Sequence, residues 1–211
     1  MSARCILLSL LLSVLVLPTV LTAQEKRIEA KPDDKKALVP ALQQGGLVVY
    51  FRHAESDQSQ TDAERIDFRD CKTQRNLTEK GREQSRAVGK AFAAMRIKIA
   101  KVITSPYCRA VEMGRLAFGR VTIDDDLAFA IRKPEAETQR LADHLRKLLA
   151  TQPPKGTNTV LIAHTANLKE AARIWPKTEG IAHIFQPDAD GRFLHVGYVL
   201  PEEWAELARV K

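Results

Sequence analysis

The chain has 211 residues and a formal net charge of +7, with 33 lysines and arginines against 26 acidic residues. This length fits a single domain with a substantial core. The modest positive excess suits anionic substrates or surfaces, but no basic run carries interleaved aromatic residues, so no nucleic-acid partner is expected. The sequence shows no internal repeat and no low-complexity segment, which argues against repeat architectures.

Residues 1–23 have the layout of a secretory signal peptide, with a basic start at Arg4, an apolar core and a polar exit. The alternative is a membrane anchor, but the apolar stretch breaks at Pro18 and is short for a span of roughly 20 residues. Cys5 precedes the apolar core, which argues against a lipoprotein cysteine. We therefore expect cleavage after Ala23, a periplasmic or secreted mature protein of charge +6, and no stable membrane span after cleavage.

Residues 24–44 are charged at first and weakly helical later, and we interpret them as a lead-in to a domain of residues 45–211. Within that domain, short apolar strands alternate with amphipathic helices. Strands are predicted at 47–51, 102–104, 121–123 and 159–163, and helices open at Thr78 and Pro134, span 109–118, and run from the last strand to about Trp175. This alternation predicts an α/β three-layer sandwich, with a mostly parallel central sheet flanked by helices.

The C-terminal part follows a different pattern. The segment "IAHIFQPDADGRFLHVGYVL" alternates apolar and polar residues around residues 188–191, which predicts a hairpin at the edge of the sheet. The final segment, "PEEWAELARV", predicts a short closing helix.

Unusual residues follow three of the predicted strands. Arg52 and His53 end the first strand, Arg109 lies in the first turn of the helix after the second, and His164 follows strand 159–163. Ligands of open α/β sheets bind beyond the carboxyl ends of the strands, near helix N-termini that favour anions. Arginine forks match phosphate oxygens, one neutral imidazole can attack phosphorus, and a second can donate a hydrogen bond. The four residues therefore predict a phosphoryl pocket.

Structural interpretations compete with this one. A single histidine after a strand is more often a satisfied polar residue than a catalyst, and Arg109 could pair with Glu112. The coincidence of three strand ends favours function, because a core gains nothing from gathering four such groups. His144, His183 and His195 lack this context and are interpreted as structural. No set of His, Cys and Asp has zinc-ligand spacing and nearby arginines would repel a metal ion, so no metal and no other cofactor is expected.

Four segments carry a resemblance to a known family. They are "FRHAES", "NLTEKGREQS", "TSPYCRAVEM" and "VLIAHT", which together span residues 47 to about 172. In this order the chain resembles the histidine phosphatase superfamily, with the phosphoglycerate-mutase-like fold, in its single-domain branch. The resemblance implies that His53 is the nucleophile that forms a phosphohistidine. It also implies that Arg52, Arg109 and His164 bind the phosphoryl group.

The sequence departs from the family's pattern at several positions. Ala54 and Thr165 stand where family members usually have glycine. The single-domain branch often takes its acid from a glutamate in a Leu-x-Glu segment, and Phe129 stands at that place here. The proton donor is therefore unassigned. Its candidates are Asp57, which is near the mouth by sequence, and Glu55, Glu112, Glu135 and Glu137.

Two cysteines remain after cleavage, Cys71 and Cys108. In an exported protein the pair suggests a disulfide, and the alternative is two buried thiols. The sequence thus predicts an exported, metal-independent phosphatase acting on a small-molecule or envelope phosphomonoester. The alternative is a non-catalytic module that binds phosphorylated ligands in the same pocket, which the missing glutamate favours. The substrate and the oligomeric state are left open.

Overall fold

The computed structural model describes residues 35–131 and 133–209, so the predicted signal peptide lies outside the described residues. Its strands are β1 (Val48–Arg52), β2 (Ile99–Thr104), β3 (Thr122–Ile123), β4 (Asn158–Ala163), β5 (Ala182–Pro187) and β6 (Phe193–Val199). Its α-helices are α1 (Lys35–Gln44), α2 (Glu79–Ala94), α3 (Cys108–Phe118), α4 (Glu135–Leu149), α5 (Thr165–Ala172) and α6 (Glu203–Leu207). Two short 3₁₀ helices are η1 (Cys71–Thr73) and η2 (Asp125–Leu127).

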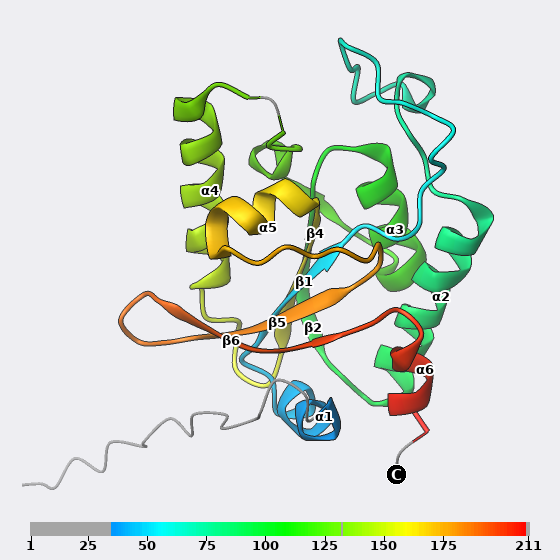
Figure 1. Cartoon of the computed structure of the whole chain (residues 1–211). Coiled ribbons are helices and arrows are strands. Elements are labelled where there is room, and N and C mark those ends of the chain that lie inside the picture. The colour runs from blue at the N-terminus through cyan, green and yellow to red at the C-terminus, as the bar shows by residue number, and fades with distance from the viewer. Residues whose placement is uncertain (1–34, 132, 210–211) are drawn as a thin grey trace, which may run out of the picture.

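The strands form one six-stranded sheet in the order β3-β2-β4-β1-β5-β6. Strands β1 to β4 pair in parallel, whereas β5 and β6 are antiparallel and form the edge hairpin. Helices cover both faces of the sheet, with α4 and α5 on one side and α2, α3 and α6 on the other (Figure 1). The predicted three-layer α/β fold is therefore confirmed. No helix in the two described ranges is both long and apolar enough to cross a bilayer.

Strand β1 is buried on both faces, which explains why it reads as an unbroken apolar run. Val49 and Phe51 face the core under α1, α2 and α6, where Phe51 lies 6.0 Å from Trp204 between ring centroids. Val48 and Tyr50 face the second core, under α4 and α5. The strand thus emerges from the sheet between two packed layers, and this fixes the position of the residues that follow it.

Helix α1 lies in the segment that the sequence pattern suggested to be a lead-in. Leu38 and Leu42 are each 1% exposed and belong to the same core as Trp204. The helix contacts β6 and α6, and Lys35 forms an ion pair with Glu203. Residues 35–44 therefore pack as part of the folded unit.

Two histidines lie side by side on the edge hairpin, where the sequence interpretation made them structural. His183 Nδ1 is 3.0 Å from His195 Nε2. The Nε2 atom of His183 is buried and has no hydrogen-bond partner among the described residues. Burial, and then the neighbouring His195, lower the pKa of His183 to about 4. The folded hairpin therefore favours the neutral ring.

We expect the stability of the protein to fall in acid because of His183. Its pKa is 6.5 ordinarily and about 4 in the fold, so the unfolded state binds more protons between these values. The contribution of His183 to the free energy of unfolding should be fully present above about pH 6.5 and should fall by about 3 kcal/mol by pH 4, in addition to the losses from other histidines with a lowered pKa. Urea unfolding across this range measures the loss, and His183→Gln should make the dependence on pH less steep. An unchanged slope in the variant would show that His183 is not responsible.

Candidate active site

The carboxyl ends of β1, β2 and β4 bring the predicted pocket residues together. His53 directly follows β1, and His164 is the residue that precedes the first turn of α5. The two imidazole rings meet edge to face, with their centroids 5.4 Å apart. Arg109 lies in the first turn of α3, after β2, and is fully buried. The parallel strand order therefore gathers residues that are far apart in the sequence.

His53 is held as a neutral ring with a defined tautomer. It is 2% exposed, and its Nδ1 lies 2.9 Å from the carbonyl oxygen of Ala54. A carbonyl oxygen can only accept, so Nδ1 carries the proton and Nε2 carries the free lone pair. Burial, and then the positive charge of Arg109, hold the pKa of His53 well below its usual range. This is the protonation state that a nucleophilic imidazole requires.

His164 is oriented in the opposite sense. Its Nε2 lies 2.7 Å from Ser105 Oγ. The Ser105 hydroxyl can donate its own proton to Nε2 while its oxygen accepts a hydrogen bond from the Tyr107 amide at 3.3 Å, and this pairing corresponds to one of the two neutral tautomers of His164. In this tautomer the proton of the neutral ring resides on Nδ1. Burial and the charge of Arg109 hold the pKa of His164 well below its usual range, which makes the ring a neutral hydrogen-bond donor.

The terminal nitrogens of Arg109 are occupied by a loop between β1 and α2. Nη1 and Nη2 donate to the two carboxylate oxygens of Asp62 at 2.8 and 3.1 Å. Nη1 also donates to the carbonyl oxygen of Arg75 at 3.2 Å. The guanidinium group stacks on Tyr107, 4.5 Å from the ring centroid. The side chain is therefore fixed along one edge and one face.

Arg52 and Arg75 share a second carboxylate, that of Glu179. Arg52 Nη2 donates to Glu179 Oε1 at 3.1 Å, while its Nη1 donates to the carbonyl oxygen of Pro176 at 3.2 Å. Arg75 Nη2 lies 3.8 Å from the same carboxylate oxygen, and its Nη1 donates to Gln58 at 2.9 Å. Both arginines are thus held by their terminal nitrogens, as Arg109 is.

Four buried donors of these side chains have no hydrogen-bond partner in the part of the chain that the structure describes. We call them the open donors: Nε of Arg52, Arg75 and Arg109, and Nδ1 of His164. An unsatisfied buried donor costs about 1–3 kcal/mol, so such a group favours a ligand with several acceptor oxygens. Arg52 and Arg75 share Glu179 and Arg109 contacts the Arg75 carbonyl, so the three arginines belong to one network of contacts, and their charges lower the pKa of His53. A phosphoryl group matches this arrangement.

Asp57, the proton-donor candidate near the mouth by sequence, is engaged in its own turn. Its carboxylate accepts hydrogen bonds from Ser59 Oγ at 2.6 Å, Ser59 N at 3.0 Å and Gln60 Nε2 at 3.0 Å. The bonds from Ser59 hold the pKa of Asp57 below its usual range. Glu55 pairs with Lys80 at 2.6 Å. The geometry therefore supports neither carboxylate as the acid, because both are held in their charged form.

The remaining candidates also lie in ion pairs or on the surface. Glu112 pairs with Arg82 at 2.7 Å, so it is not the partner of the buried arginine on α3. Glu137 pairs with Lys133 at 3.0 Å, and Glu135 shares the first turn of α4 with it. None of these contacts places a carboxylate at the open donors.

Phe129, at the place of the family's glutamate, belongs to the site as an apolar wall. Its ring centroid lies 4.9 Å from that of His164 and 6.4 Å from that of Tyr107. The aromatic contact adds to the burial of the His164 ring. Of the two positions where glycine is usual, Ala54 is fully buried and Thr165 opens α5.

Four residues of the site were not predicted from the sequence: Asp62, Arg75, Ser105 and Glu179. Arg75 could have been found, because it stands two residues before the "LT" of a motif that opens a helix beside the pocket. Ser105 could also have been found, because it directly follows a strand end. Asp62 and Glu179 lie in irregular loops, where no periodic pattern indicates which way a side chain points.

A disulfide joins Cys71 and Cys108, whose Cα atoms lie 5.7 Å apart. Cys108 directly precedes Arg109 at the start of α3. Beside the disulfide, the Cys108 amide donates to Gln74 Oε1 at 2.9 Å. The loop that carries Asp62 is therefore fastened to the helix that carries its arginine partner.

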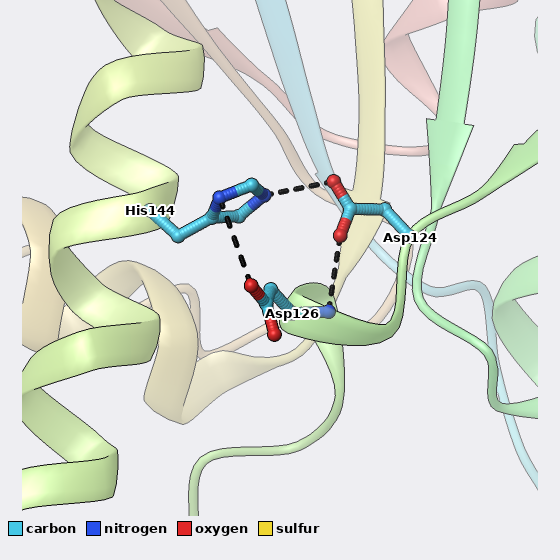
Figure 2. A group of neighbouring side chains, drawn as sticks. All are labelled: Asp124, Asp126 and His144. Carbon is cyan, nitrogen blue, oxygen red and sulfur yellow. Dashed lines mark hydrogen bonds and ion pairs between the residues drawn. The ribbon is translucent and has the colours of Figure 1, made fainter.

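One group of side chains outside the pocket has the composition of a metal site. Figure 2 shows His144 of α4 between Asp124 and Asp126. The two ring nitrogens approach different carboxylates, at 2.8 Å for Asp124 and 3.9 Å for Asp126. Asp124 also accepts a hydrogen bond from the Asp126 amide at 3.0 Å, and Arg140 pairs with Asp126 at 2.8 Å. These contacts tie α4 to η2, in keeping with the structural role inferred for His144.

Residues 48–130 match the family model of the histidine phosphatase superfamily (branch 1). The fold is similar to a candidate alpha-ribazole-5'-P phosphatase from Escherichia coli, with a TM-score of 0.55 and 12% identity over 72% of this chain and 95% of that chain. It is also similar to a mutant phosphoserine phosphatase from Entamoeba histolytica in complex with phosphoserine, with a TM-score of 0.52 and 12% identity over 74% and 98% of the two chains. No curated protein sequence matches the chain.

Proposed function

We propose that this protein, a member of the histidine phosphatase superfamily, is an exported phosphatase that hydrolyses a phosphomonoester through a phosphohistidine on His53. The proposal is supported above all by the four open donors around a neutral histidine. Neutral His53 supplies the lone pair for attack, and three guanidinium groups supply the positive charge that a phosphoryl group requires.

The reaction follows from the tautomers and the donors. Nε2 of His53 attacks phosphorus, a nitrogen–phosphorus bond forms, and the ester oxygen leaves with the bonding electron pair and takes a proton from water. The arginine Nε groups and His164 Nδ1 donate hydrogen bonds to the phosphoryl oxygens and stabilise the negative charge on these oxygens in the transition state. A water molecule then attacks phosphorus and gives its proton to the hydroxide left by the first step, the nitrogen–phosphorus bond breaks with its electron pair returning to Nε2, and inorganic phosphate leaves.

The substrate class follows from Phe129 and from the predicted compartment. With an aromatic ring where a glutamate is usual, substrates whose leaving oxygen needs little protonation should react best. The predicted signal peptide and the disulfide favour an oxidising compartment, so we place the protein in the periplasm or outside the cell. A small-molecule or envelope phosphomonoester fits both conditions, and we expect turnover without a metal ion.

Phosphate release tests the proposal. Residues 24–211 are incubated with 4-nitrophenyl phosphate and with an alkyl phosphate, in the presence and absence of a chelator. We expect release from both, faster from the aryl ester and unaffected by the chelator. The alternative function, a non-catalytic binder, predicts binding of inorganic phosphate in calorimetry without release from either ester.

Arg109→Lys is expected to lower kcat/KM by about 10-fold or more, which corresponds to about 1.4 kcal/mol of transition-state stabilisation. Lysine keeps the charge, but one ammonium group cannot hold Asp62 by two bonds and still offer a second edge to phosphate. Initial rates with the aryl ester measure the effect. Arg115→Lys, at the exposed end of the same helix, is the control. Near-wild-type rates for Arg109→Lys would place this arginine outside the pocket.

A further inference from the structure

The loop of residues 57–76 forms a long excursion between β1 and α2 (Figure 1). One carboxylate of this loop, that of Asp62, forms hydrogen bonds with two residues of the pocket, Arg75 and Arg109. Asp62 Oδ1 accepts hydrogen bonds from Arg109 Nη1 at 2.8 Å and from the Arg75 amide at 2.9 Å. The Arg75 carbonyl oxygen in turn accepts a hydrogen bond from Arg109 Nη1 at 3.2 Å. Asp62 therefore links two of the arginines that carry open donors.

Asp62 also compensates a charge that burial opposes. The side chain of Arg109 is 0% exposed and that of Asp62 is 22% exposed. Burial lowers the pKa of Arg109, and the hydrogen bonds and charge of Asp62 raise it. A buried cation that loses its partner is strongly destabilised. Asp62 thus offsets the cost of burying the guanidinium charge of Arg109.

The geometry separates a supporting role from a blocking one. A guanidinium group has five N–H donors, and Asp62 and the Arg75 carbonyl take three of those of Arg109. The carboxylate occupies the edge formed by the two terminal nitrogens. The other edge, which contains the open donor Nε, can receive two oxygens of a phosphoryl group while Asp62 stays in place.

We propose that Asp62 is a positioning residue of the active site, which holds Arg109 by one edge so that the opposite edge binds the phosphoryl group. The inference rests on the proposed function. It assigns a role to the excursion between β1 and α2, which supplies the carboxylate that the buried arginine of α3 requires. The competing role is that of an internal anion that occupies the phosphate position, and the test below distinguishes the two.

The test compares Asp62→Ala with Asp67→Ala, which removes another carboxylate of the same loop. Asp67 forms a surface ion pair with Arg69 at 3.3 Å, in which the Arg69 side chain is 92% exposed. We expect Asp62→Ala to lower kcat/KM for the aryl ester by about 10- to 100-fold, because misplaced binding groups cost about this much. The Kd for inorganic phosphate, measured by calorimetry, should rise about 10-fold. Asp67→Ala should match the wild type in both.

Formate provides a readout that a general loss of structure would not give. A small carboxylate can fill the space left in Asp62→Ala and rebind the terminal nitrogens of Arg109. We expect formate at millimolar concentrations to restore part of the activity of Asp62→Ala, and to activate neither the wild type nor Asp67→Ala. If Asp62→Ala does not fold, Asp62→Asn keeps the shape and removes the charge, and its kcat/KM and phosphate Kd should change in the same directions.

Several results would overturn the inference. Tighter phosphate binding by Asp62→Ala than by the wild type would identify Asp62 as a blocking anion. Wild-type kinetics and binding in both Asp62 variants, or a loss in Asp62→Ala that formate does not relieve, would remove the positioning role. A wild-type protein that binds phosphate but releases none from either ester would instead refute the proposed catalysis. The phosphate Kd of the variants would still test Asp62 in that case.

Discussion

Replacing His53 with alanine is expected to abolish phosphate release, lowering kcat/KM by roughly a thousand-fold or more. The variant loses the Nε2 lone pair that the proposal assigns to the attack on phosphorus, while the open donors stay in place. Initial rates with the aryl ester measure the loss, and thermal melting shows whether the fold survives. His144→Gln, a histidine variant on α4, should keep near-wild-type activity at temperatures where it is folded.

The covalent intermediate gives an independent check of the same step. Rapid acid-free quenching with a ³²P-labelled ester should label the wild-type protein and leave His53→Ala unlabelled. A phosphoramidate on histidine is labile in acid and stable in base, so the label should show both properties. Label recovered on serine or aspartate would contradict the proposed nucleophile, even if His53→Ala were inactive.

Removing the Cys71–Cys108 disulfide is expected to have the largest effect on stability. The bond closes a sequence separation of 37 residues, for which chain entropy predicts about 3–4 kcal/mol. We expect a fall of that size in the free energy of unfolding on reduction or in Cys71→Ser/Cys108→Ser. Activity should fall as well, because the disulfide fastens the Asp62 loop to the start of α3 and so holds Arg109 in register.

Thiol counting and unfolding decide between the disulfide and two buried thiols. The mature protein, residues 24–211, should show no titratable thiol when it is purified from an oxidising compartment and then denatured. Two titratable thiols, or an unfolding curve that does not respond to reductant, would rule the disulfide out. A reduced protein with lower stability and full activity would leave the disulfide a structural role and remove its catalytic one.

The parallel sheet explains how much of the site could be predicted. Parallel strands all end at the same edge of a sheet, so the residues that directly follow them lie near one another. His53, Arg109 and His164 were therefore expected together, although more than a hundred residues separate the first from the last. The identity of the partners could not be predicted this way. Glu112 follows Arg109 by one helical turn, yet it pairs with Arg82 across the α2–α3 contact.

The residues that could not be predicted from the sequence pattern lie mainly in loops. Asp62 and Glu179 contact the arginines from irregular segments whose path depends on tertiary contacts. One of these contacts is the disulfide, which the cysteine count suggested without showing where it would place the loop. Helix α1 was underestimated for a related reason. Its apolar residues form one short run that contains Pro40 and shows no clear period, and contacts with β6 and α6 make Leu38 and Leu42 part of a core.

The packing of α1 also determines when folding of the chain can be completed. Leu38 lies where a side chain on Gly197 would meet it at 3.0 Å, and Lys35 pairs with Glu203, so the first described helix is completed by the last strand and helix. Helix α1 therefore has no complete surface to pack against until β6 and α6 have been synthesised. A chain of this topology stays incomplete throughout its elongation. On the proposed route of export, transport that proceeds during synthesis would therefore act on a chain that has not completed its fold.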